Sequence, residues 1–157
     1  MAGAQQKHST RYTQRAKPIG REELCKVARL LRLEAWRIWL ATLGTDFDLV
    51  GVRRRRDVEM GIETVVVEAK AVLHEKNIQH AINQLYFRRH FFNRVYIATR
   101  GDSVWYALAL VPNQFGVIDV SSMTIVRDSK LFVGGYHRYL KLSLLASRGG
   151  RGRELLT

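Results

Sequence analysis

The spacing of apolar residues predicts two amphipathic helices in this chain. The first is expected to begin near Gly20, and the second to run from about Glu75 to Phe92. Both show apolar residues at positions i, i+3, i+4 and i+7, which is the spacing of one helical face. These positions are Leu24, Val27, Ala28 and Leu31 in the first helix, and Ile78, Ala81, Ile82 and Leu85 in the second. Each helix therefore has an apolar face that must pack against another part of the fold.

Runs of β-branched and aromatic residues, bounded by glycine or charged segments, predict the strands. In chain order these segments are 36–40, 47–53, 62–72, 94–99 and 116–120. A short third helix is expected at 104–110. Because strands and helices are interleaved along the chain, the order favours an α/β fold with a mixed central β-sheet flanked by helices.

Length and composition favour one domain between two basic ends. The chain has 157 residues, of which 46% are apolar, enough for one substantial core. Residues 1–18 carry Lys and Arg without acidic residues and are expected to form a flexible basic arm. The glycine- and arginine-rich segment 147–157 is expected to be a basic tail, which leaves 19–146 as the domain.

The charge of the chain points to a polyanionic partner. Lys and Arg number 26 against 14 acidic residues, a formal net charge of +12, so nucleic acid is favoured over an anionic membrane. No apolar run approaches the ~20 residues that span a bilayer, and the N-terminus lacks a signal-peptide apolar region. With a single cysteine, Cys25, no intrachain disulfide can form. We therefore expect a soluble, cytoplasmic protein.

Charged residues directly after an apolar strand form the candidate site. The run Val65–Val67 is followed by Glu68, Ala69 and Lys70. Side chains alternate along a strand, so Glu68 and Lys70 are expected on one face. If 46–54 and 62–70 form a hairpin with its loop centred near Val58, Asp48 lies directly opposite Glu68. Opposed carboxylates repel unless a cation binds between them, and Mg²⁺ usually takes one or two carboxylates together with water.

Two alternatives accompany this interpretation. Asp46 shares a face with Asp48 and is the competing ligand, and a register slip of one residue would put the acids on opposite faces. Lys70 or an arginine could also form a purely structural ion pair with either acid.

Together these residues resemble the PD-(D/E)xK nuclease superfamily, whose core is the restriction-endonuclease-like fold. Asp48 matches the lone aspartate of the pattern, preceded here by Phe47 in place of proline. Glu68-Ala69-Lys70 matches the (D/E)xK element, and Glu23 matches the acid of the first helix. The resemblance covers roughly residues 20 to 120.

Within the superfamily, the chain resembles the RecB-type or the archaeal resolvase-like subgroup, and the second helix carries the similarity to RecB-type nucleases. Gln84-Leu85 resembles the Gln-Leu element of the RecB-type subgroup, although Tyr86 follows immediately here and not at the third position. Gln79 is the alternative glutamine.

The resemblance implies Mg²⁺- or Mn²⁺-dependent hydrolysis of phosphodiester bonds in DNA, with RNA left open. Asp48 and Glu68 would hold the metal, with Glu23 acting through water. Lys70 would position the attacking water or stabilise charge on the phosphate, and Gln84 would orient the nucleophile. Small nucleases of this fold often pair to cut both strands, so a homodimer is also implied.

Two arginine clusters are the candidate nucleic-acid contacts. Arg53, Arg54, Arg55 and Arg56 follow the Asp48 strand and are expected to grip phosphates beside the site. Arg88 and Arg89 form a second cluster among phenylalanines. A basic nucleic-acid-binding or assembly protein that keeps a nuclease-like core without cleaving is the alternative function.

Overall fold

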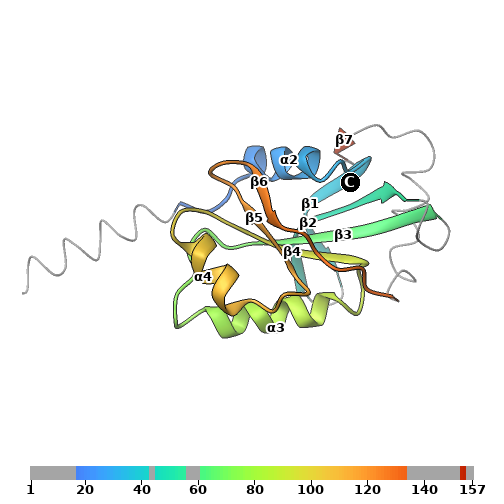
Figure 1. Ribbon diagram of the computed structural model, residues 1–157. Helices are drawn as coiled ribbons and strands as arrows, with labels where there is room; N and C mark the ends of the chain where they lie inside the picture. The colour runs from blue at the N-terminus through green and yellow to red at the C-terminus, as the bar shows by residue number, and fades with distance from the viewer. Residues whose placement is uncertain (1–16, 43–44, 56–60, 134–152, 155–157) are drawn as a thin grey trace, which may run out of the picture.

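The computed structural model describes residues 17–42, 45–55, 61–133 and 153–154, which form an α/β fold around one mixed sheet. The helices are α2 (Arg21–Leu30), α3 (Ile78–Arg88) and α4 (Ser103–Leu110). The strands are β1 (Ala35–Thr42), β2 (Thr45–Arg54), β3 (Ile62–Ala69), β4 (Arg94–Thr99), β5 (Gly116–Asp119), β6 (Thr124–Arg127) and β7 (Arg153–Glu154). Figure 1 shows α2 on one side of the sheet, and α3 and α4 on the other.

The strand order is β6-β5-β4-β3-β2-β1-β7. The strands β1, β2 and β3 form antiparallel neighbours, whereas β3, β4 and β5 run parallel. Helices α3 and α4 lie in the two crossovers that parallel pairing requires. The predicted α/β fold with a mixed, helix-flanked sheet is therefore confirmed.

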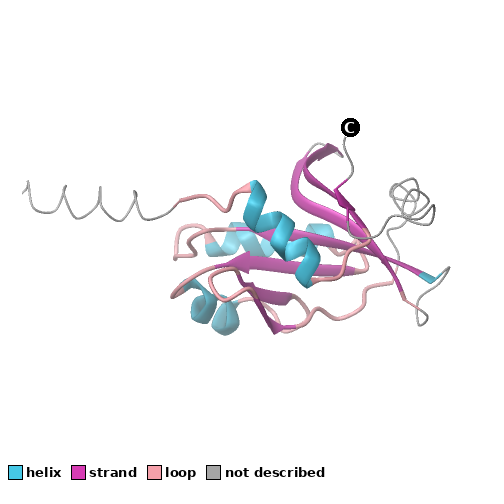
Figure 2. Ribbon diagram, turned by 90° about the horizontal axis from the view of Figure 1, so that it is seen from above, coloured by secondary structure: helices cyan, strands magenta, loops and turns pink. Residues whose placement is uncertain are grey.

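Two apolar clusters fill the space on the two sides of the sheet. Under α2, Leu24 and Val27 pack against Leu49, Val65 and Val67 of the central strands. The other cluster lies under α3 and α4 and is built from alternate strand positions together with the apolar faces of these helices. Seen from above, α2 crosses the strands, as Figure 2 shows. Val65, Val66 and Val67 are all fully buried because the sheet is covered on both faces.

The β2–β3 hairpin has the register that the sequence predicts. Paired positions run from Leu49 opposite Val67 to Arg54 opposite Ile62, without a shift. Continuing this register by one residue places Asp48 opposite Glu68. The one-residue slip that would have separated the acids does not occur.

Two element boundaries were predicted too generously. The third strand ends at Ala69 and not at Val72, and a turn follows Val72, where the Asn77 side chain donates to Val72 O and accepts from His74 N. The second helix spans Ile78–Arg88 and not 75–92, and the chain then turns into β4. Strands β6 and β7 were not predicted.

Parts of the domain prediction lie outside the described residues. These include residues 1–16 of the expected basic arm, Arg56, and most of the expected tail. Among the helices of the described ranges, none is long and apolar enough to cross a membrane.

Candidate metal and phosphate site

Asp48 and Glu68 meet where β3 ends. Asp48 Oδ2 accepts a hydrogen bond of 2.7 Å from the backbone N–H of Ala69. This bond fixes the Asp48 carboxylate against the residue that follows Glu68. Glu68 is 4% exposed, and the negative charge of Asp48 reaches it. The structure therefore brings together the two acids that the hairpin register predicted.

The surroundings oppose ionisation of both acids. Burial, followed by the charge of Asp48, raises the pKa of Glu68 from 4.5 to about 7, although Arg88 and Lys70 act in the opposite direction. Burial also raises the pKa of Asp48, and its bond from Ala69 N partly offsets this effect. A buried pair of this kind becomes easier to ionise when a cation binds, because the cation stabilises both charges.

Two basic side chains flank Glu68 from different elements. Lys70 Nζ lies 3.6 Å from Glu68 Oε1, and the Lys70 side chain is 27% exposed, so it is partly open to solvent. Arg88 comes from α3, is 1% exposed, and places Nη2 3.0 Å from Glu68 Oε2. Arg88 also donates to the backbone oxygens of Gln84 and Asp46 and lies over the Phe47 ring. Lys70 is therefore accessible to a ligand, whereas Arg88 is part of the packed interior.

Several buried polar atoms here lack hydrogen bonds. Within the described ranges, Glu68 Oε2, Gln84 Oε1 and Arg88 Nε have no hydrogen-bond partner, so the close approach of Arg88 to Glu68 is an ion pair without hydrogen-bond geometry. Gln84 lies one helical turn before Arg88, on the same side of α3. Unsatisfied buried polar atoms are uncommon and call for an explanation such as an absent water or ion.

The donor set fits a hard divalent cation in part. Two carboxylates suit Mg²⁺, which completes its shell with water and phosphate oxygens. The buried Gln84 Oε1, which has no hydrogen-bond partner within the described ranges, is consistent with such a ligand. No cluster of three or more His, Cys, Asp or Glu suited to a metal occurs within the described ranges, so the protein would supply two acids.

The structure separates the competing candidates. Asp46 is exposed, and Asp48 is the acid that lies against Glu68. Gln79 is exposed and donates to Asn83, whereas Gln84 has a buried oxygen. The geometry therefore favours Asp48 and Gln84.

Glu23 does not join the two acids. Its Oε1 accepts from Gly20 N at 3.2 Å, which caps α2, and lies 3.3 Å from Arg100 Nη2. No hydrogen bond or ion pair links it to Asp48 or Glu68 in the part of the chain that the structure describes. The expected contact through water stays a prediction.

The arginine run is not beside the site, contrary to the expectation from sequence. Arg54 lies at the other end of β2 from Asp48, about 20 Å away at ~3.3 Å per residue. It pairs with Glu34 at 3.3 Å. Arg53 is only 13% exposed and donates to Glu63 and to Leu31 O, each at 2.7 Å. A phosphate bound at Asp48 could not also contact Arg53, Arg54 or Arg55. Arg56 lies outside the described residues.

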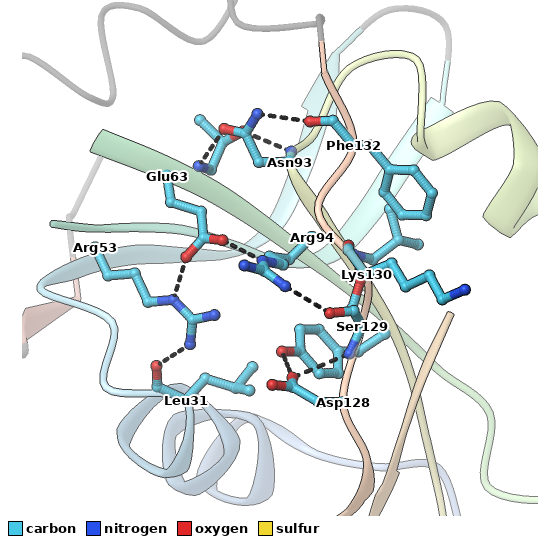
Figure 3. Close-up of polar contacts among 12 residues, drawn as sticks. Leu31, Arg53, Glu63, Asn93, Arg94, Asp128, Ser129, Lys130 and Phe132 are labelled. Carbon is cyan, nitrogen blue, oxygen red and sulfur yellow. Dashed lines mark hydrogen bonds and ion pairs between the residues drawn. The ribbon is translucent and has the colours of Figure 1, made fainter. Parts of the chain in front are cut away.

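Arg53 belongs instead to a buried polar network around Glu63, shown in Figure 3. Glu63 is fully buried and accepts from the Nε atoms of both Arg53 and Arg94. Arg94 in turn donates to Ser129 O at 2.7 Å. These contacts join β2, β3 and β4 to the end of α2 and to the segment after β6. The network has a structural purpose that requires no ligand.

Arg88 was also predicted to contact nucleic acid, but its side chain is buried and cannot meet a ligand at the surface. Arg89 is half-buried and lies over the Tyr86 ring, so the two arginines do not form one patch. The partnership of Arg88 with Glu68 was missed. A signal for it existed, because Arg88 continues the buried spacing of Ile78, Ala81 and Leu85.

Ionisation of Glu68 should make the metal-free protein less stable as pH rises. Its folded pKa of about 7 lies above the ordinary 4.5, so the folded state holds an extra proton between these values. The stabilising contribution is complete below pH 4.5 and is lost as pH rises through about 7. Glu68→Gln cannot ionise and should lack this loss, which is at most roughly 3 kcal/mol. Urea unfolding in EDTA across this pH range measures the difference from wild type.

The exposed Glu22→Gln variant is the control for removing one glutamate. A constant free-energy difference between Glu68→Gln and wild type at every pH would contradict the raised pKa of Glu68.

The comparison with known proteins supports the fold of this chain and does not bear on its function. No family model matches this chain, and no curated protein matches it. The chain is similar to a solved structure described as the SPO1766 protein of unknown function from Silicibacter pomeroyi. The two are 20% identical with a TM-score of 0.52, over 79% of this chain and 83% of that chain. At this identity the likeness concerns the fold alone.

Proposed function

We propose that this protein is a metal-dependent nuclease that hydrolyses phosphodiester bonds in DNA, with a PD-(D/E)xK-type site on a restriction-endonuclease-like core. The observation that carries the proposal is the meeting of Asp48 and Glu68 beside the accessible ammonium of Lys70. The net charge of +12 supports a polyanionic substrate.

Asp48 and Glu68 would hold Mg²⁺ or Mn²⁺, which would polarise the phosphate and lower the pKa of a bound water. Asp48 is already oriented by Ala69 N, so its carboxylate needs little reorganisation to act as a ligand. Glu68 must lose its proton first, because a carboxylate binds metal in its ionised form. Arg88 holds Glu68 from the interior side, and Lys70 supplies a positive charge on the solvent side, where a phosphate would arrive.

The direct test is a cleavage assay of the full chain with Mg²⁺ or Mn²⁺ on plasmid, linear duplex, single-stranded and branched DNA. Cutting of any of these that EDTA abolishes is the expected result. DNA binding without cutting of any substrate in either metal would contradict the proposal.

Lys70→Met should slow cleavage about a hundredfold while DNA affinity changes less than about threefold. The substitution keeps the length of the side chain and removes the partly exposed positive charge that would stabilise the developing negative charge on the phosphate. Single-turnover cleavage and binding in EDTA separate the two quantities. Lys76→Met, at an exposed lysine on the following turn, is the matched control and should cleave at the wild-type rate. Equal losses in both variants would show that only general basic charge matters.

A non-cleaving nucleic-acid-binding protein is the second candidate, and one observation favours it. Arg88 and Lys70 act to lower the pKa values of both Glu68 and Asp48, so they offset part of the acids' negative charge without a metal. Under this alternative the cluster is a structural ion-pair network. It then predicts that saturating Mg²⁺ leaves the thermal unfolding temperature unchanged, whereas a metal-binding site raises it by mass action.

A further inference from the structure

Trp39 has a backbone conformation that is unusual for its side chain. Its φ angle is 55°, in the left-handed region that bulky residues rarely adopt. It lies inside β1, yet pairing with β2 keeps one register on both sides of it, from Ile38–Leu49 to Leu40–Phe47. No extra residue is inserted, so the conformation is not a bulge.

The left-handed residue changes which face the neighbouring side chains occupy. Ile38 and Leu49 belong to the cluster under α2, whereas Leu40 and Phe47 pack into the cluster under α3. Residues two apart in a regular strand share a face, so the two strands switch faces between these pairs. The register places Trp39 opposite Asp48 at the switch. Asp48 reaches Ala69 N there, while Trp39 is 53% exposed.

Arg21 holds a cation over the indole of Trp39. The guanidinium carbon lies 5.3 Å from the ring centroid, and Arg21 is itself ion-paired with Glu154 of β7. A cation at this distance from an indole attracts its π-face and restrains the ring. Trp39 is thus an exposed aromatic ring that Arg21 of α2 restrains.

We propose that Trp39 is a stacking platform for an unpaired base, and that the protein therefore binds single-stranded DNA, including the frayed end of a duplex. This inference rests on the proposed function. Every base has a π-face, but the bases inside an intact duplex already stack on their neighbours. The net charge of +12 complements a phosphate backbone and favours a nucleic acid over an apolar protein partner.

Trp39→Asn is the variant that tests the platform. Asn tolerates a left-handed backbone better than other non-glycine residues, so the substitution removes the ring without adding strain. Binding is measured in EDTA, so that nothing is cut, with labelled oligothymidylate and with a blunt GC-rich duplex. We expect at least about a fivefold loss of affinity for oligothymidylate, because base stacking is a substantial part of single-strand binding. Duplex affinity should change less than about twofold.

Two further variants make the result specific. Trp39→Phe keeps a ring and should retain most of the single-strand affinity. Trp105→Asn removes an indole that is 74% exposed on α4 and should change neither affinity. Unchanged oligothymidylate binding in Trp39→Asn, or an equal loss on both DNAs, would overturn the platform.

The platform and the nuclease proposal can fail separately. If the wild type cleaves duplex and single-stranded DNA at equal rates and Trp39→Asn has no effect, the stacking platform is contradicted and the nuclease proposal stands. If the wild type cuts no DNA but Trp39→Asn selectively loses affinity for oligothymidylate, the nuclease proposal is contradicted and the stacking platform stands, in a protein that binds DNA without cleaving it.

Discussion

Under the proposed nuclease function, Asp48→Asn is expected to lower the rate of magnesium-dependent DNA cleavage at least about a thousandfold, because several kcal/mol of transition-state stabilisation would depend on the bound metal. The amide oxygen of asparagine can still accept the hydrogen bond from Ala69 N that Asp48 Oδ2 accepts at 2.7 Å. The fold should therefore be kept while a negatively charged ligand is lost. Single-turnover cleavage, together with DNA affinity in EDTA and urea unfolding, measures all three quantities.

Asp46→Asn is the matched control for this variant. Asp46 lies two residues away on β2, carries the same charge, and is exposed to solvent. It should cleave within about threefold of wild type, since an exposed charge contributes little to chemistry at a distance. Equal loss in both variants would indicate an effect of net charge. Full activity of Asp48→Asn would remove Asp48 from the site and would point to a contaminating nuclease or to another set of residues.

The register of the β2–β3 hairpin could be predicted because local pattern and loop position agree. The Val65–Val67 run fixes a buried strand, and a loop centred near Val58 leaves one simple pairing of Asp48 with Glu68. The choice between Asp46 and Asp48 could not be made in this way, because both acids share a face in a regular strand. The choice between the two acids depends on the switch of faces at Trp39. Residues 35–42 contain no glycine or asparagine that would signal a left-handed residue.

The arginine run misled for a different reason. A strand has two ends, and sequence adjacency to β2 does not say which end carries the site. Asp48 lies near the start of β2 and Arg54 closes it, so a phosphate group at one end is remote from the other. Arg53 also forms an ion pair with Glu63 that the sequence alone does not show, because the β2–β3 pairing places these two residues opposite each other. A basic cluster in sequence thus became an internal ion pair.

The buried ion pairs of Glu63 lead to the largest expected effect on stability. Glu63→Gln should lower the free energy of unfolding by roughly 3–5 kcal/mol, the cost of removing one partner from a buried charged group. Glu63 is fully buried between Arg53 and Arg94, with one carboxylate oxygen for each Nε donor. A glutamine offers one oxygen and one NH₂ group, so one arginine would face a donor in place of an acceptor. Urea unfolding at neutral pH measures the loss.

Glu34→Gln removes the same charge from an accessible pair and serves as the control. Glu34 lies 3.3 Å from Arg54, and their side chains are 29% and 56% exposed. Solvent screens such a pair, so its removal should cost less than about 1 kcal/mol. Similar losses in the two variants would show that burial does not amplify the Glu63 interactions. A large loss in Glu63→Gln alone would mean that the network in Figure 3 stabilises the sheet at the end remote from Asp48, so that Arg53 cannot be released to bind DNA without a cost in folding stability.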